Sequence, residues 1–191
     1  MDFYSKYFFP FPRLRTTDLV LRKIRIGDVE DLYEYCKRPE SCRYSNWTVH
    51  TSPKDTRDYV YWMQGRYIKK QGYTFAVEYA GRVIGTASFM EFDEHYGTVE
   101  IGYGINSDYW HKGFGTQIVS ALLHYAFKKM NMQRVWAKVM PENERSAGLL
   151  KKCGFTYEGR ARKSEYIKGK YIDIDTYAIL KDEYFALKGE K

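Results

Sequence analysis

Residues 100–127 read EIGYGINSDYWHKGFGTQIVSALLHYAF and join two patterns of different period. Around Glu100, apolar residues alternate from Val99 to Ile105, which predicts a strand over residues 98–105. Residues 116–130 carry apolar side chains at helical spacing, which predicts a long helix there. The segment between them is therefore a loop that ends where a helix begins.

Gly113-Phe114-Gly115-Thr116 occupies the end of that loop. The first N–H groups of a helix lack internal acceptors and lie at the positive end of the helix dipole. Glycine lets phosphate oxygens approach such groups closely, and Lys112 adds positive charge beside them. The pattern predicts a phosphate site; the alternative is a tight turn with a solvated lysine. The spacing of the glycines matches neither a Walker A loop nor a dinucleotide fingerprint.

Charge is distributed unevenly along the chain. The 191 residues carry a net charge of +7, and the surplus lies in residues 111–170, which hold 13 Lys and Arg but only 4 Asp and Glu. Such a surplus is typical of a solvated basic face, or of a site for nucleic acid or for a small ligand with several phosphates.

Composition indicates one compact domain. With 44% apolar, 18% aromatic and 29% charged residues, the chain can bury a core, which excludes a disordered chain or a disulfide scaffold. The longest apolar stretch is too short to cross a bilayer, and the first residues lack a signal-peptide pattern. Three cysteines without C-x-x-C spacing and four scattered histidines argue against a metal site. We expect a cytoplasmic protein without a membrane partner.

The rest of the chain alternates between strand and helix patterns. A strand is predicted from Leu19 to Ile26, followed by a helix that Asp28 caps. Ser52-Pro53 opens a second helix that runs to about Gln71. Strands are further predicted over 73–79, 82–89, 134–140, 155–162 and 171–180, and a helix over 144–152. This order predicts an α+β fold.

Three motifs together resemble a known family. They are WHKGFGT at 110–116, NERS at 143–146 and LLKKCGF at 149–155, and in them the chain resembles the GNAT superfamily of N-acetyltransferases. The opening LRTTDLVLRKIRIGDVEDLYEY at 14–35 and the run from Asn143 to Phe155 resemble the RimJ/RimL-type branch of that superfamily. The resemblance covers about residues 14–180 and implies a single N-acetyltransferase domain over 1–191. It implies a mixed, mostly antiparallel sheet flanked by helices, in which a central pair of parallel strands splays apart and acetyl-CoA enters the gap.

The resemblance also implies a set of site residues. The end of the strand at Tyr103, Gly104 and Ile105 is expected to bind the pantetheine arm through its backbone. The loop is expected to hold the pyrophosphate, through Lys112, Gly113, Phe114, Gly115 and Thr116. Asn143 and Ser146 are expected beside the pantetheine and its thiol. The sequence departs from the family pattern at Trp110, where many members have Gln or Arg, and at Leu150, where many have a tyrosine general acid.

Two residues are candidates for acid–base chemistry. Glu100 is the candidate base that takes a proton from an amine, and its alternative is a solvent-facing strand residue. Because Gly102 and Gly104 share its face and have no side chains, a trough beside the carboxylate is expected. Ser146 is the candidate acid or thiolate partner, and its alternative is a helix serine that bonds to its own backbone.

Three functions are compatible with these observations. The favoured one is transfer of an acetyl group from acetyl-CoA to a primary amine, either a protein N-terminal α-amine or a small molecule, by direct attack in a ternary complex. The others are a non-catalytic acyl-CoA-binding or sensing module and, less favoured, a basic RNA- or ribosome-binding protein. Specific nucleic-acid binding is not expected, and a homodimer is compatible with the resemblance. Trp47 is expected either to line an acceptor pocket or to anchor the core.

Overall fold

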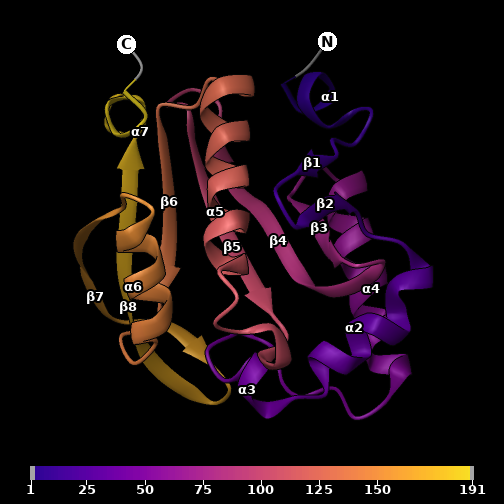
Figure 1. Ribbon diagram of the computed structural model, residues 1–191. Coiled ribbons are helices and arrows are strands. Elements are labelled where there is room, and N and C mark those ends of the chain that lie inside the picture. Colours follow the sequence, from indigo (N-terminus) through magenta and orange to yellow (C-terminus); the bar gives the residue numbers. More distant parts are fainter. Residues whose placement is uncertain (1–2, 190–191) are drawn as a thin grey trace.

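The computed structural model describes residues 3–189 and contains one mixed sheet (Figure 1). Within these residues eight strands are hydrogen-bonded in the order β1-β2-β3-β4-β5-β6-β8-β7. The strands are β1 (Leu14–Arg15), β2 (Leu19–Lys23), β3 (Tyr73–Tyr79), β4 (Arg82–Asp93), β5 (Thr98–Ile105), β6 (Arg134–Val139), β7 (Thr156–Ile167) and β8 (Lys170–Leu180). Every neighbouring pair is antiparallel except β5 and β6, which confirms the predicted α+β sheet.

Helices cover both faces of this sheet. They are α1 (Phe3–Phe8), α2 (Val29–Cys36), α3 (Pro39–Cys42), α4 (Pro53–Ile68), α5 (Phe114–His124), α6 (Glu144–Lys152) and α7 (Lys181–Leu187). The larger core packs α5 against one face of the sheet, where Phe75 and Val77 of β3 point. The smaller core packs α2 and α4 against the other face, where Ala76 points. Alternation along β3 therefore sends neighbouring residues into different cores. No helix of the described chain is long and apolar enough to span a bilayer.

The central parallel pair splays, as the family resemblance implies. Strands β5 and β6 pair at only three positions, the last of which joins Glu100 to Trp136. Beyond that point β5 pairs only with β4 as far as Ile105, and β6 pairs only with β8 as far as Val139. Each strand keeps one antiparallel neighbour, so a gap opens between them without unravelling either half of the sheet.

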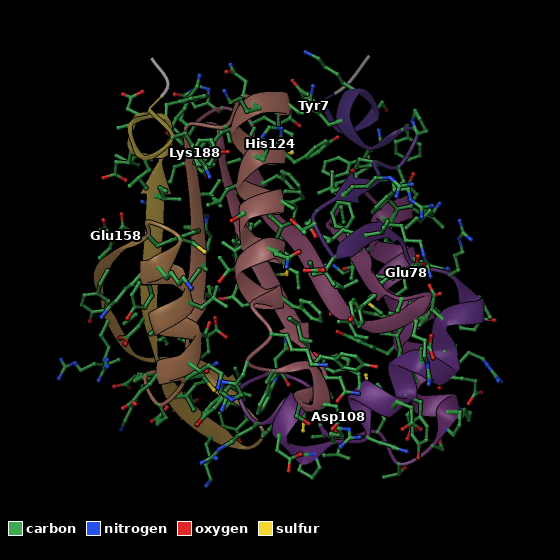
Figure 2. The ribbon with its side chains drawn as sticks, viewed as in Figure 1. Tyr7, Glu78, Asp108, His124, Glu158 and Lys188 are labelled. Atoms are coloured by element: carbon green, nitrogen blue, oxygen red, sulfur yellow. The ribbon has the colours of Figure 1, made fainter. Side chains whose placement is uncertain are left out.

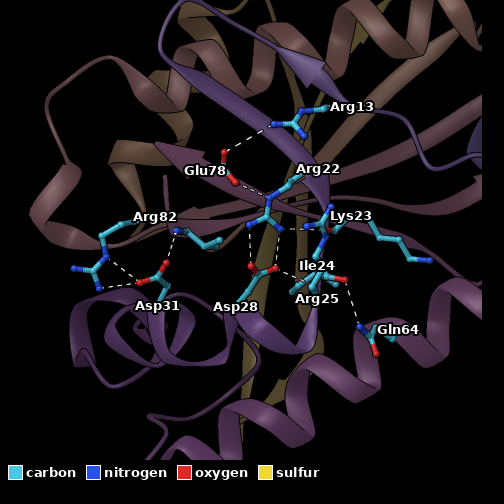
Figure 3. A network of polar contacts seen from close by, with 11 residues as sticks. Arg13, Arg22, Lys23, Ile24, Arg25, Asp28, Asp31, Gln64, Glu78 and Arg82 are labelled. Carbon is cyan, nitrogen blue, oxygen red and sulfur yellow. Dashed lines mark hydrogen bonds and ion pairs between the residues drawn. The ribbon is translucent and has the colours of Figure 1, made fainter. Parts of the chain in front are cut away.

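The region after β2 differs from its prediction. The strand ends at Lys23, and Ile26–Asp28 forms a 3₁₀ turn in place of the expected continuation. Asp28 does not cap α2 through its side chain. Its carboxylate instead accepts two hydrogen bonds of 2.8 Å from the guanidinium of Arg22, and one from the N–H of Arg25 (Figure 3). Arg22 also donates to Glu78, 2.6 Å away on β3. The half-buried Arg22 thus binds the carboxylate that sequence reasoning assigned to the helix cap.

Other boundaries shift by a few residues. The hairpin of β3 and β4, strand β5 and helix α6 begin at their predicted residues. Helix α4 ends at Ile68 instead of Gln71, and α5 begins two residues early because Gly113 takes a left-handed φ of 77° and caps it. A π-helical segment, Tyr125–Lys129, continues the long helix beyond α5. Helices α1, α3 and α7 and the short strand β1 were not predicted.

Packing over β5 yields a first prediction. A Cβ on Gly104 would lie 2.2 Å from the hydroxyl oxygen of Tyr35, whereas a Cβ on Gly102 would meet only the mobile end of Met90, at 2.8 Å. Overpacking of this kind costs about 1–3 kcal/mol. Gly104→Ala should therefore lower the free energy of unfolding in urea by about 2 kcal/mol, and Gly102→Ala by clearly less.

The Tyr35→Phe variant tests whether the Tyr35 hydroxyl causes this loss of stability. In Tyr35→Phe the nearest remaining ring atom is 3.3 Å from the added Cβ, so Gly104→Ala should then cost little. Equal losses for both glycine variants, or no relief in the Tyr35→Phe background, would contradict this account of the packing.

Candidate functional site

The loop before α5 presents a row of free backbone donors. Gly113 caps the helix without a side-chain hydrogen bond, and the first helical bond is donated by Gln117 to the carbonyl of Gly113. The N–H groups of residues 112–116 have no hydrogen-bond acceptor among residues 3–189. Figure 2 shows Asp108, in the same loop, at one edge of the molecule and His124 at the other end of α5. Such a row at a helix start is a suitable cradle for phosphate oxygens.

The two glycines of the loop serve different purposes. A Cβ on Gly113 would meet nothing within 4 Å, so its requirement is the positive φ. A Cβ on Gly115 would lie 2.3 Å from a methyl carbon of Leu149 on α6. Gly115 therefore also allows α5 and α6 to pack closely, which is a reason for glycine beside the phosphate approach predicted for it. Phe114 is buried and packs its ring against Tyr79, 4.8 Å between centroids.

Trp110 ties this loop to the end of β5. Its indole N–H donates to the carbonyl of Ile105 over 2.9 Å, so that carbonyl is already satisfied within the protein. The guanidinium of Arg145 stacks on the indole at 3.9 Å. Trp110 thus holds the loop in place and sets a cation from the first turn of α6 beside it. Sequence analysis missed both contacts, because they join residues from separate motifs.

Asn143 and Ser146 lie at the start of α6. The side chain of Asn143 caps the helix by accepting the N–H of Ser146 at 3.2 Å. The Ser146 hydroxyl is 3.0 Å from that of Tyr103, on β5, and makes no other hydrogen bond within the described chain. The alternative of a serine bonded to its own helix backbone is therefore not what the structure has. Leu150, one turn further, is fully buried and apolar.

Glu100 is buried, with 7% of its surface exposed, and does not face solvent. Loss of hydration raises its pKa to about 7, with the charges of Glu91 and Glu165 acting in the same direction and Lys138 and Arg66 opposing. No hydrogen bond or ion pair holds its carboxylate among residues 3–189. A carboxylate in this state is suited to take up a proton near neutral pH.

The other buried carboxylates of the described chain are paired. Asp28, 6% exposed, lies against Arg22, and Asp175, 6% exposed, accepts two hydrogen bonds from Arg160. Lys138, whose charge lowers the pKa of Glu100, forms an ion pair with Glu165, with 2.8 Å between Nζ and Oε1. Burial of an unpaired carboxylate is costly, and among the described residues Glu100 is the buried carboxylate without a bonded cation.

The trough predicted beside Glu100 is largely filled. The Tyr35 hydroxyl occupies the space over Gly104, and the methyl of Met90 occupies the space over Gly102. A cavity of about 490 Å³ opens instead where the end of α4 faces the irregular part of β4 next to Glu100. Its walls are formed by Trp62, Arg66, Lys70, Gln71, Glu91 and Phe92. Two of these residues, Arg66 and Glu91, act on the pKa of Glu100, so the cavity lies within its electrostatic reach.

Trp47 lies in an aromatic cluster between α3 and α4. Its ring is 5.6 Å from that of Tyr35 and 5.4 Å from that of His50, and it packs against the smaller core. It is not part of the wall of the 490 Å³ cavity. Within residues 3–189 no group of three or more His, Cys, Asp or Glu side chains is arranged to hold a metal ion.

Comparisons with known proteins agree with this fold. The model of the acetyltransferase (GNAT) domain matches residues 18–156. The uncharacterized N-acetyltransferase p20 of Bacillus licheniformis is 36% identical over 173 residues, which cover 90% of this chain and 97% of the relative. A solved acetyltransferase (GNAT family) from Bacillus anthracis superposes with a TM-score of 0.79 at 28% identity, covering 90% of this chain and 99% of that one.

Relatives with a stated acceptor are more distant. The ribosomal-protein-serine acetyltransferase of Escherichia coli is 29% identical, over 86% of this chain and 93% of the relative. The spermidine N(1)-acetyltransferase of Vibrio cholerae is 29% identical, over 58% of this chain and 64% of the relative. RimL, a ribosomal L7/L12 alpha-N-protein acetyltransferase solved in complex with coenzyme A, has the same fold, with a TM-score of 0.78 at 24% identity over 90% of this chain and 99% of that one.

The raised pKa of Glu100 predicts a dependence of stability on pH. The folded state holds this proton more tightly than the unfolded chain, whose value is 4.5, so the protein loses stability as pH rises from about 4.5 through about 7. Glu100→Gln removes that loss. The variant should gain roughly 2–3 kcal/mol of unfolding free energy over the wild type between pH 5 and pH 8, measured by urea titration.

Glu94→Gln, at an exposed position of the turn between β4 and β5, is the matched control and should run parallel to the wild type at both pH values. A constant difference between Glu100→Gln and the wild type across this range would show that the carboxylate titrates as an ordinary one.

Proposed function

This chain belongs to the GNAT family of acetyltransferases, and from that premise we propose that it transfers an acetyl group from acetyl-CoA to a primary amine by direct attack in a ternary complex. The observation that carries the proposal is the position of Glu100. It is the buried, unpaired carboxylate at the last residue of β5 that pairs with β6, where the two strands part.

Residues 112–116 hold the pyrophosphate of coenzyme A in this proposal. The row of unpartnered N–H groups, the positive end of α5 and the ammonium of Lys112 fit a group with two adjacent phosphates. The edge of β5 from Tyr103 to Ile105, which β6 has left, offers backbone groups other than the carbonyl of Ile105 to the pantetheine arm. Acetyl-CoA supplies the acetyl group as an activated thioester.

Glu100 accepts the proton of the attacking amine. An α-amine with a pKa near 8 costs about 1.4 kcal/mol to neutralise at pH 7, and a lysine-type amine about 4.6 kcal/mol. A carboxylate with a pKa near 7 takes such a proton more readily than an ordinary one, whose value is 4.5. The proton passes either directly or through a water molecule.

The acceptor enters through the 490 Å³ cavity, two of whose wall residues, Arg66 and Glu91, act on the pKa of Glu100. Its walls combine an indole, a guanidinium that is fixed by the carbonyl of Gln71 at 2.6 Å, and the carboxylate of Glu91. Such mixed walls suit a small amine or the first residues of a protein N-terminus. Both kinds of acceptor occur in the names of relatives, one acting on a ribosomal protein and one on spermidine.

Two measurements test the function. Acetyl-CoA should raise the melting temperature in a thermal-shift titration, and an amine panel should elicit thiol release. The panel combines peptides with free N-termini, spermidine and amino acids. Binding without thiol release from any amine would favour an acyl-CoA-binding module, and absence of binding would overturn the proposal.

Gly113→Ala tests the phosphate cradle. A residue with a side chain at φ 77° is strained by about 1 kcal/mol. The backbone relieves this strain by changing φ, which rotates the N–H groups that follow. The Kd for coenzyme A should rise about tenfold by calorimetry, whereas binding of S-acetylpantetheine, which has no pyrophosphate, should not change. Gly148→Ala, where an added Cβ meets nothing within 4 Å, is the control and should bind both ligands as the wild type does. Equal weakening for both ligands would place the pyrophosphate elsewhere.

Glu100→Gln tests the base. Turnover with the best acceptor should fall roughly 10²–10⁴-fold, and part of the loss should return at high pH, where more of the amine is neutral. The Kd for acetyl-CoA should stay within a factor of two, because the carboxylate lies on the face of the sheet opposite α5. Glu94→Gln is the control for removal of a charge. A wild-type pH–rate profile in Glu100→Gln, together with a loss in Glu91→Gln, would move the base to Glu91.

A further inference from the structure

One side-chain hydrogen bond spans the gap between the splayed strands. Tyr103 lies on β5, beyond the last residue that pairs with β6, and Ser146 lies on α6, which follows β6. Their hydroxyl oxygens are 3.0 Å apart, although the residues are 43 positions apart in the chain. The contact therefore connects the two halves of the sheet where backbone hydrogen bonds between them have ceased.

Either hydroxyl of this pair can be the donor, and the direction determines which hydrogen is left for another acceptor. Burial raises the pKa of Tyr103 above its ordinary value, so its phenol keeps its proton at neutral pH. Ser146 makes no other side-chain hydrogen bond within residues 3–189, while its backbone N–H is held by Asn143. If the phenol donates to the Ser146 oxygen, the single hydrogen of the serine hydroxyl stays available to another acceptor.

We infer that Tyr103 is a positioning residue, which donates to the Ser146 oxygen and so directs the serine O–H toward the sulfur that leaves during acetyl transfer. The inference rests on the proposed function and adds to it the side chains of Tyr103 and Ser146. The amine nitrogen forms a bond to the acetyl carbon, the carbon–sulfur bond breaks, and its electron pair goes to sulfur. The amine proton goes to Glu100, and the serine O–H donates a hydrogen bond to the thiolate.

In this arrangement the pair of Tyr103 and Ser146 takes the place of a tyrosine on α6. Leu150, where many family members carry one, is fully buried and has no proton to donate. Here a phenol from β5 and a hydroxyl from α6 meet at the gap instead. A thiolate with an ordinary pKa near 8.5 needs only a hydrogen bond at neutral pH, and not a full proton. A serine oriented by a neutral phenol supplies that.

The first test titrates the thiol of bound coenzyme A by thiolate absorbance in the ultraviolet, after calorimetry has established binding. The bound thiol should have a pKa about one unit below that of free coenzyme A. Ser146→Ala and Tyr103→Phe should each return it toward the free value, and the double variant should add nothing further. Tyr125→Phe, which removes a hydrogen-bonded phenol hydroxyl just beyond α5, is the control and should leave the thiol pKa unchanged.

The second test uses turnover. Tyr103→Phe should lower kcat about tenfold with acetyl-CoA and leave KM within a factor of two. The loss should vanish with an acetyl thioester of an aromatic thiol, whose leaving group needs no stabilisation. A defect in folding would lower both rates equally, and a thermal melt of each variant checks that the fold is kept.

The outcomes separate the two proposals. No binding of coenzyme A by the wild type would overturn both. Binding with a thiol pKa equal in the wild type and in both single variants would overturn only the role of Tyr103, whether or not acetyl transfer is found. Additive effects of Tyr103→Phe and Ser146→Ala would also overturn it, because the two residues would then act separately.

Discussion

The parting of β5 and β6 is the constraint on which the rest of this structure depends. Backbone groups released from pairing must find other partners or face a ligand. The molecule satisfies some of them internally, as the indole of Trp110 does for the carbonyl of Ile105. It also closes one side of the gap with the hydroxyls of Tyr103 and Ser146. Because β4 and β8 still pair with the outer edges, the gap is held open by a rigid sheet and not by a mobile loop.

Two of the three buried carboxylates of the described chain are paired with arginines, and Glu100 is the exception. Arg22 with Asp28 and Arg160 with Asp175 neutralise carboxylates that have lost their water, and the first pair fixes the turn that leads into α2 (Figure 3). Glu100 is equally buried but has no cation bonded to it. Burial destabilises the charged form of Glu100, and this raises its pKa. A sheet stabilised elsewhere by large aromatic packing tolerates that cost.

Local patterns predicted what depends on local sequence, and tertiary contacts decided the remainder. Alternation identified β5 and placed Glu100 opposite Tyr103, and helical spacing identified α6. Glu100 is buried because α2 and α4 cover its side of the sheet. The sequence around residue 100 does not show that these helices pack there. Gly115 is small because Leu149 approaches it, and Asp28 left its helix cap for Arg22. Each of these outcomes rests on a partner from another element.

The two-residue repeat of a strand also explains why the groups proposed for the chemistry do not interfere. Glu100 points to the face covered by α2 and α4, and Tyr103, an odd number of residues later, points to the face covered by α5 and α6. Both α5 and α6 begin just after the ends of the parallel strands, so their positive ends gather on the second face. Beside those ends and Lys112, a carboxylate would have a depressed pKa and would bind protons poorly. Separation by the sheet keeps Glu100 basic while the opposite face stays suited to phosphate and thiolate.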